Sequence, residues 1–298
     1  MAQAQAQVAR AVAVWGAGGA GGAVPPLPCT PDALPGALAD ARWDTRFTVA
    51  GVAGPDGDAP HVADFARDLD GTVLATGRFR WLGAERVEPL LRAAPGQASA
   101  GVWAPARDTW EIAPPEFGGF SSVAVGPAGE LALATTGLSP QIWIDSGAGL
   151  QAIAQLNAAS DAFDYVRSMA WYDGALWVAG WFTLTNGVSN LAVWDGVEWT
   201  QAPNGIIDGP VYDLLVDGQT TLVAAGTLWR GEFPPQERMV LRFDGTRFDW
   251  LAGGVAANFV SDAAVTAEGL WFAGAIAETG VGADRVSTVG IARLGWPR

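Results

Sequence analysis

The sequence predicts an all-β fold, a five-bladed β-propeller of four-stranded antiparallel blades. Three observations predict it: one phrase recurs along the chain, Gly-containing turns separate short apolar runs, and no 3.6-residue period is sustained. The phrase is a short strand ending in Ala-x-Gly or a close relative, at Gly77, Gly137, Gly180, Gly226 and Gly274. Spacings of 60, 43, 46 and 48 residues with Asp-Gly turns favour radially repeated β-blades over a helical solenoid.

The first strand of each repeat carries the phrase Val-x-Asp/Ser, or its nearest match, followed by two further residues that are mostly apolar. The five copies begin at Val62, Phe120, Val166, Val211 and Val260. A turn such as Asp70-Gly71 or Asp173-Gly174 then leads into the second strand, because both residue types tolerate a positive φ. We expect the Gly that ends the second strand to lie where the backbone of a neighbouring sheet approaches closely.

The third and fourth strands are clearest in the third and fourth repeats. Third strands are predicted at 191–196 and 241–245, each ending in an Asp-Gly turn, with fourth strands beginning near Trp199 and Phe248. The aromatic pairs Trp194/Trp199 and Phe243/Phe248 should flank these turns.

The fifth repeat supplies only three strands, the last at 287–296. Residues 41–55 resemble the end of a repeat and are predicted to close the ring beside that strand, which would remove an exposed sheet edge. A six-bladed ring is the alternative. It would need residues 1–40 to form most of a blade, and the Pro-rich stretch 25–35 speaks against this.

The predicted organisation is a flexible Ala/Gly/Pro-rich leader or linker at 1–40, followed by the propeller at 41–298. Residues 1–28 suit either a secretory leader or a flexible tail. Cys29, the single cysteine, is either an unpaired thiol in that segment or a lipid-anchored residue. The blades are expected at about 56–118, 119–163, 164–206, 207–255 and 256–298, the last completed by 41–55.

The Ala-x-Gly strand ends, Trp194-Asp-Gly196 and Phe243-Asp-Gly245 make the chain similar to the kelch-like, WDG-containing repeats of secreted bacterial propeller proteins. The resemblance covers about residues 41–298. It implies a propeller scaffold of the kind used for adhesion, sugar binding and enzymes alike, in a secreted or envelope-associated protein.

Composition excludes several classes of function. The net charge is −14 and all 17 basic residues are Arg, so a nucleic acid is not expected as a partner. No apolar run approaches 18 residues, so no membrane-spanning helix is expected. One His and one Cys exclude a zinc site built from several such ligands, and no nucleotide-binding fingerprint follows a strand. The sequence leaves the oligomeric state open.

The third position of the Val-x-Asp/Ser phrase is the first candidate site, because it is polar in every copy. Its residues are Asp64, Ser122, Ser168, Asp213 and Asp262. If the first strand is innermost, these side chains approach the central channel. The three carboxylates could then hold Ca²⁺ or act as acid and base in glycoside cleavage. The structural alternative is that they cap backbone amides between neighbouring blades.

Aromatic residues in the loops after the second strands are the other candidate site. Trp81, Trp181 and Trp229, mixed with Arg80 and Arg230, lie on the face that carries the loops before each first strand. Aromatic faces on a concave rim suit a sugar or an extended peptide, although such indoles also fill gaps between blades.

Two functional hypotheses follow. The leading one is a non-catalytic binding or scaffold propeller that recognises a glycan, peptide or protein through the loop face around the channel. The alternative is a glycan-active enzyme that uses Asp64, Asp213 and Asp262 at the channel mouth. No cofactor is expected, and Ca²⁺ is the one ion that the carboxylates could hold.

Overall fold

A computed structural model describes most of the predicted propeller. The described residues are 52–53, 61–79, 81–82, 85–86, 89–95, 104–105, 117–137, 140–147, 149–156, 165–203, 209–217, 221–226, 239–251, 255–266, 269–279, 286–288 and 290–295. The expectations for the leader or linker at 1–40, including Cys29, lie outside these ranges.

The described chain is all β, and its main sheets are antiparallel blades of a β-propeller, as predicted. Blade 1 is formed by β2 (His61–Arg67), β3 (Val73–Arg78), β6 (Leu90–Ala93) and β7 (Ala104–Pro105). Blade 2 is formed by β8 (Phe117–Val125), β9 (Leu131–Gly137), β10 (Gln141–Asp145) and β11 (Leu150–Gln155). Blade 3 is formed by β12 (Tyr165–Tyr172), β13 (Ala175–Thr183), β14 (Ser189–Trp194) and β15 (Trp199–Gln201).

Blade 4 repeats this meander, whereas blade 5 departs from it. Blade 4 is formed by β16 (Val211–Asp217), β17 (Thr221–Gly226), β18 (Val240–Phe243) and β19 (Phe248–Trp250). Blade 5 is formed by β20 (Val255–Thr266), β21 (Gly269–Thr279), β22 (Val286–Ser287) and β23 (Ile291–Gly295). Both β22 and β23 pair with β21, so they share the place of the third strand.

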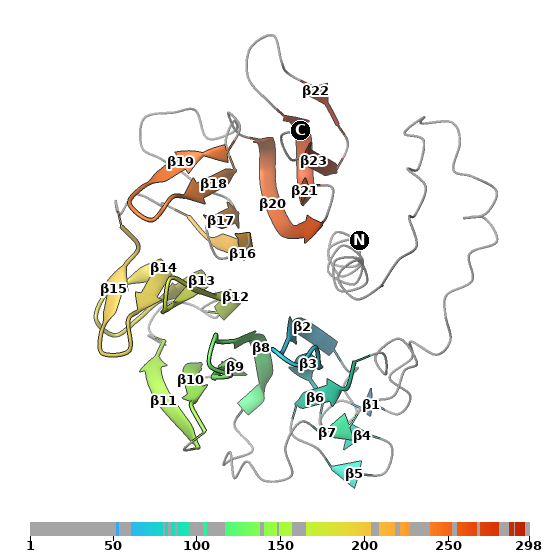
Figure 1. Cartoon of the computed structure of the whole chain (residues 1–298), viewed down its shortest axis with the longest axis vertical. Coiled ribbons are helices and arrows are strands. Elements are labelled where there is room, and N and C mark those ends of the chain that lie inside the picture. Colours follow the sequence, from blue (N-terminus) through green and yellow to red (C-terminus); the bar gives the residue numbers. More distant parts are fainter. Residues whose placement is uncertain are drawn as a thin grey trace, which may run out of the picture.

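The five blades follow one another in chain order around a common centre, with the first strand of each blade nearest to it (Figure 1). The condition that the first strands are innermost is therefore met. β8 begins at Phe117 and β20 at Val255, slightly before the blade boundaries that the sequence predicts.

The expected closing strand is wrong for the two residues of it that the structure describes. β1 (Val52–Ala53) pairs with β4 (Trp81–Leu82), which in turn pairs with β5 (Glu85–Arg86). The β3–β6 connection of blade 1 forms this small hairpin, and the hairpin offers β1 an edge that the sequence pattern does not reveal. The remaining residues of 41–55 lie outside the described ranges.

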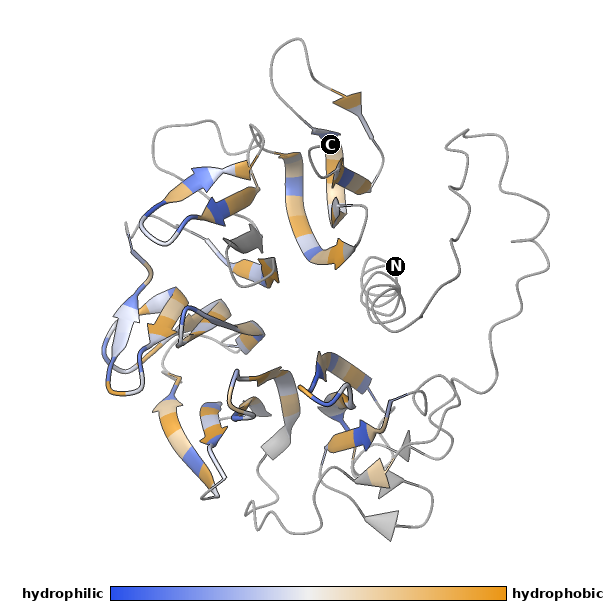
Figure 2. Cartoon of the chain, in the orientation of Figure 1, coloured by the Kyte–Doolittle hydropathy of each residue, from blue (hydrophilic) through white to orange (hydrophobic). Residues whose placement is uncertain are grey.

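Apolar clusters join the neighbouring blades. Between blades 3 and 4, Tyr172 and Trp177 pack against Phe243 and Phe248, with the Trp177 and Phe243 ring centroids 5.0 Å apart. The Phe243 and Phe248 rings are 4.9 Å apart across the hairpin turn, as predicted for this aromatic pair. Hydrophobic residues are accordingly concentrated on the strands (Figure 2). Burial of such faces supplies most of the free energy that holds blades together.

The Asp173-Gly174 turn forms as predicted. Asp173 and Gly174 both have positive φ, 50° and 76°, and connect the paired residues Tyr172 and Ala175 in a two-residue hairpin.

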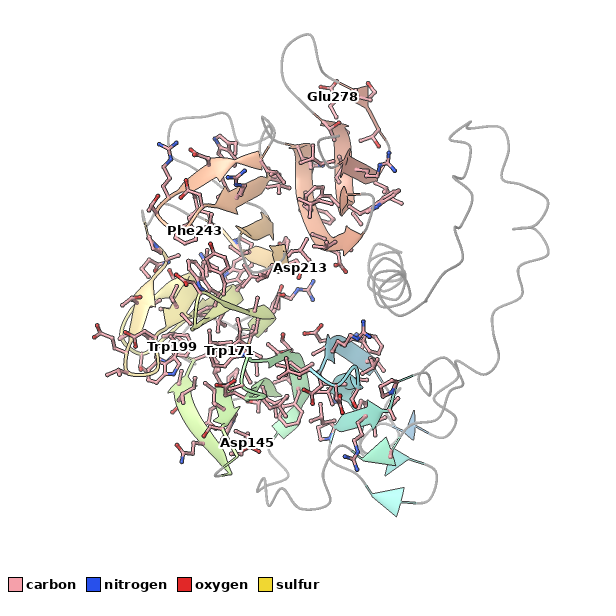
Figure 3. All side chains as sticks on the ribbon, viewed as in Figure 1. Asp145, Trp171, Trp199, Asp213, Phe243 and Glu278 are labelled. Carbon is pink, nitrogen blue, oxygen red and sulfur yellow. The ribbon has the colours of Figure 1, made fainter. Side chains whose placement is uncertain are left out.

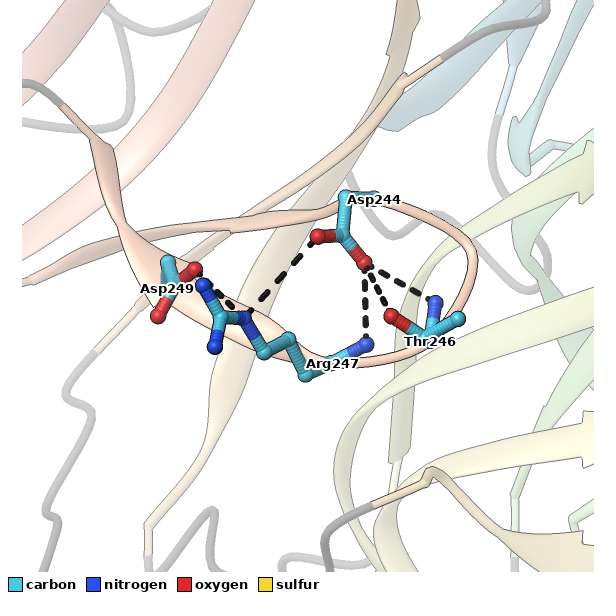
Figure 4. A network of polar contacts seen from close by, with 4 residues as sticks. All are labelled: Asp244, Thr246, Arg247 and Asp249. Atoms are coloured by element: carbon cyan, nitrogen blue, oxygen red, sulfur yellow. Dashed lines mark hydrogen bonds and ion pairs between the residues drawn. The ribbon is translucent and has the colours of Figure 1, made fainter.

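In the β18–β19 turn, Asp244 Oδ1 accepts hydrogen bonds from Thr246 Oγ1 (2.8 Å), Thr246 N (2.9 Å) and Arg247 N (3.0 Å) (Figure 4). These donors stabilise the carboxylate and lower the pKa of Asp244 to about 2.

Among the residues that the structure describes, none belongs to a helix whose length and hydropathy would suit a membrane span.

Candidate functional site: the bulges of the inner strands

Each inner strand contains a β-bulge within the Val-x-Asp/Ser phrase. In blade 1, Val62 pairs with Gly77 and Asp64 with Thr76, so Ala63 is an extra residue with no partner of its own in the ladder. The same register shift occurs in the other four inner strands. The five bulge residues are Ala63, Ser121, Arg167, Tyr212 and Ser261.

The recurring Gly of the second strand faces this bulge. A Cβ atom on Gly77 would lie 1.9 Å from His61 O, and one on Gly226 would lie 2.3 Å from Pro210 O. His61 begins the inner strand β2 of the same blade as Gly77, and Pro210 directly precedes the inner strand β16 of the same blade as Gly226. The expected approach of a neighbouring sheet is therefore wrong for these positions: the bulged strand of the same sheet approaches the Gly.

Blade 2 corrects the alignment of the repeats. There Thr135, not Gly137, pairs with Phe120 at the bulge, and Gly137 pairs with Phe117 two positions farther along the ladder. In this blade Gly119 is the residue approached by a neighbouring sheet, since a Cβ on it would lie 2.4 Å from Gly77 O. The LATTG phrase thus resembles the other copies in sequence, but its Gly does not pair with the residue before the bulge as the Gly of the other copies does.

The repeated polar side chains turn toward the neighbouring blades and are buried, with exposures of 0–6%. Asp64 Oδ2 in blade 1 accepts hydrogen bonds from Ser122 Oγ (2.7 Å) and Val123 N (3.1 Å) in blade 2. These contacts join the two blades at the level of the bulges.

The same contact recurs at the boundary between blades 3 and 4 and at the boundary between blades 4 and 5. Ser168 Oγ in blade 3 accepts from Leu214 N (3.2 Å) and lies 2.8 Å from Asp213 Oδ1, to which it donates. Asp213 Oδ2 accepts from Ala263 N in blade 5 at 2.8 Å. Three times, then, the polar side chain of one blade receives the amide that follows the equivalent residue of the next blade. Figure 3 shows Asp213 on the inner strand β16, nearer the centre than Phe243 and Trp199.

This geometry corrects the first candidate site. Asp64, Ser122, Ser168, Asp213 and Asp262 were expected to approach the channel, but they are buried in the blades. Asp64 and Asp213 act as the structural alternative predicts, capping amides across blade boundaries. Within the described ranges, no group of three or more His, Cys, Asp or Glu residues could hold a metal ion. The hydrogen bonds across the blade boundaries at Asp64 and Asp213 speak against the expected Ca²⁺ site and acid–base pair at these carboxylates.

The bulge residues are, in contrast, all partly exposed. In blades 3 and 4 they belong to a contiguous strip that continues to Phe259 of blade 5. The Arg167 guanidinium lies over the Tyr165 ring, 5.2 Å from its centroid, and 5.6 Å from the Tyr212 centroid in the next blade. Tyr212 then meets Phe259 of blade 5 edge to face at 6.3 Å. We call Tyr165, Arg167, Tyr212 and Phe259 the Tyr–Arg strip.

Trp181 adjoins this strip. It pairs with Tyr165 in the β12–β13 ladder, and directly opposed side chains stand on the same face of a sheet. Trp181 is 51% exposed, which is unusual for so large an apolar side chain. This is the one Trp of the second candidate site whose side chain the structure describes. The side chains of Trp81, Trp229, Arg80 and Arg230 lie outside the described part.

Arg167 is the charged residue of the Tyr–Arg strip. Partial burial raises the pKa of the Tyr165 phenol, and the nearby Arg167 charge opposes that shift. The guanidinium forms no hydrogen bond or ion pair with any residue in the described ranges, and its contacts there are the two tyrosine rings.

Sequence reasoning missed Arg167 and Tyr212 because they occupy the unspecified middle position of the Val-x-Asp/Ser phrase. The signal was nevertheless present. The flanking positions are nearly constant among the five copies, whereas the middle one is Ala, Ser, Arg, Tyr or Ser. In a repeat scaffold, a variable position between two fixed ones is where a local role is expected.

Comparison with known proteins places the chain beside other propellers at low similarity. No family model matches the chain, and no curated protein matches it either. Among solved structures, it is similar to a gluconolactonase from Xanthomonas campestris, with 14% identity and a TM-score of 0.44 over 71% of this chain and 68% of the other. A chain of a nidogen–laminin complex aligns with 15% identity and a TM-score of 0.46 over 72% of each chain.

The WD40 β-propeller domain of Doa1 aligns with 14% identity and a TM-score of 0.37 over 76% of this chain and 64% of the other. Similarity at this level assigns neither a family nor a ligand to the chain.

Proposed function

We propose that this chain is a non-catalytic binding propeller that holds an extended ligand across the inner strands of blades 3 to 5. The observation that carries the proposal is the difference in burial between two neighbouring residues at each bulge. The fixed polar residue is buried between blades, whereas the variable residue beside it is partly exposed and, in blades 3 and 4, is Arg167 or Tyr212.

The composition of the exposed strip supports binding. Tyr, Trp and Arg are the side chains most enriched at the energetic centres of recognition sites, since they combine large apolar area with hydrogen-bonding groups. Trp181, Tyr165 and Tyr212 bring these features together on neighbouring blades. The kelch-like character of the repeats and a secreted or envelope location remain predictions that accord with this function.

Peptide and glycan arrays probed with the labelled protein test the proposal. We expect at least one class of ligand to be retained, and Tyr212→Ala or Trp181→Ala to weaken its binding by roughly thirtyfold, the loss typical of an interface anchor. Val197→Ser is the matched control, because Val197 is 83% exposed at a blade 3 turn far along the sheet from the strip. Binding that survives both strip substitutions, or a folded protein that retains nothing, would refute the proposal.

A further inference from the structure

Resting on the proposed binding function, we infer that Arg167 captures the carboxylate of an acidic residue in a peptide ligand. The guanidinium sits on the bulge of β12, partly exposed, with the Tyr165 and Tyr212 centroids at 5.2 and 5.6 Å. Both distances are within the range of favourable cation–π contact. The rings therefore hold the guanidinium in place before any ligand arrives.

The Arg167 guanidinium donates no hydrogen bond to any residue in the described part of the chain, where its contacts are the two rings. A guanidinium has five N–H donors in its own plane, and aromatic contacts engage its faces rather than these donors. No described carboxylate pairs with it. Asp213 follows Tyr212 of the strip in the chain, and its oxygens bond Ser168 and the amide of Ala263. A planar, preorganised fork without an anion is suited to bidentate binding of a carboxylate.

The charge of the whole chain limits how acidic the ligand is. With a net charge of −14, the protein repels a polyanion over distances of about a Debye length. A single carboxylate that reaches Arg167 avoids most of that repulsion. The expected ligand thus carries one isolated Asp or Glu, or a terminal carboxylate, rather than an acidic run.

The packing of the rings favours a peptide over an acidic sugar. An acidic sugar held by Arg167 would need a free aromatic face next to the guanidinium, yet Arg167 itself lies over Tyr165, and Tyr212 is contacted by both Arg167 and Phe259. Trp181 is the large ring left 51% exposed, beside Tyr165. A peptide satisfies this arrangement when its acidic side chain meets Arg167 and an adjoining apolar side chain covers Trp181.

The inference can be tested with two pools of fluorescein-labelled nonapeptides. The pools are randomised in the same way at every position except the central one, which is Glu in one pool and Gln in the other. Fluorescence anisotropy should show at least tenfold tighter binding of the Glu pool to the full chain. Arg167→Gln should weaken binding of the Glu pool by about tenfold to a hundredfold, the value of a lost charge-assisted pair, and leave the Gln pool unchanged.

Two further variants separate the effect of the Arg167 charge from that of its planar shape and check for effects on folding. Arg167→Lys keeps the charge but loses the planar fork, so we expect intermediate affinity with a steeper dependence on salt. Arg293→Gln is the matched control: Arg293 also stacks on an aromatic ring, 5.5 Å from the Trp271 centroid, but on β23. It should bind both pools as the unmodified chain does, and thermal unfolding checks that each variant is folded.

The outcomes distinguish this inference from the function on which it rests. Equal binding of the Glu and Gln pools, with both lost in Tyr212→Ala, would overturn the role of Arg167 and leave the binding propeller standing. Arg167-dependent capture of a glucuronate-bearing glycan without capture of the Glu pool would overturn the peptide assignment. If the folded protein bound none of the probes, both the role of Arg167 and the proposed binding function would be overturned.

Discussion

Asp213 shows how one side chain joins three blades. Its two carboxylate oxygens accept from Ser168 Oγ in blade 3 and from Ala263 N in blade 5, while the residue itself belongs to blade 4. It is 5% exposed, so water cannot replace these bonds when the carboxylate is removed.

We therefore predict that Asp213→Ala lowers the free energy of unfolding by about 3 kcal/mol, since it leaves a buried amide and a buried hydroxyl without an acceptor. Asp213→Asn should cost nearly as much, because its NH₂ group would face N–H donors. Urea denaturation measures both losses. Asp249→Ala is the control, since that carboxylate is 57% exposed on β19 and its removal should cost less than about 0.5 kcal/mol. Similar losses for Asp213→Ala and Asp249→Ala would contradict this account of the blade boundaries.

Asp244 provides a test of turn electrostatics by pH. Its folded pKa is lowered to about 2, chiefly by the Thr246 hydroxyl and then by the Thr246 and Arg247 amides. A lowered carboxyl pKa means that the contribution of this turn to stability is present above the ordinary value of 3.8 and is lost as pH falls toward 2.

The ¹³C carboxyl resonance of Asp244 should accordingly titrate near pH 2. Thr246→Val should move its midpoint up toward the ordinary value and leave that of Asp195, in the corresponding turn of blade 3, where it was. A midpoint that does not respond to loss of the hydroxyl would show that another group lowers the pKa.

At the scale of the strand, the bulge and the Gly opposite it form one device. The extra residue bends the inner strand. The carbonyl oxygen of the residue two positions before it lies so close to the second strand that only a hydrogen fits at Gly77, Gly180, Gly226 and Gly274. Blade 2 differs in placing Thr135 opposite the bulge and Gly119 against blade 1.

Gly226→Ala should therefore destabilise the protein by about 3 kcal/mol, because the added methyl would lie 2.3 Å from Pro210 O and the ladder must shift. Gly196→Ala is the comparison. Gly196 has a φ of 100° with open space around it, so that substitution should cost only roughly 1 kcal/mol of backbone strain. Calorimetry that finds equal losses would show that the close approach is relieved without strain.

At the scale of the molecule, repetition explains what the sequence predicted well. Recurring turns and strand ends report on backbone geometry directly, so the propeller, the inner first strands and the aromatic pairs across the hairpins are as expected. The closing strand was a different kind of inference, from a resemblance of residues 41–55 to a strand, and Val52–Ala53 pairs elsewhere.

The candidate site was predicted less well, for a reason of strand geometry. In a regular strand Asp64 would share a face with Val62 and oppose Ala63. The bulge breaks the alternation, so the polar side chain turns to the next blade and the middle residue is left partly exposed. A pattern of letters identifies the polar position but does not reveal the bulge that redirects it.

The unpaired middle residue of each bulge also makes the chain mutationally tolerant at the positions of the proposed binding surface. Ala63, Ser121 and Ser261 occupy the places that Arg167 and Tyr212 hold in blades 3 and 4, without a ladder partner of their own. Specificity can thus drift, or be engineered, blade by blade, while the buried carboxylates and glycines that maintain the architecture stay unchanged.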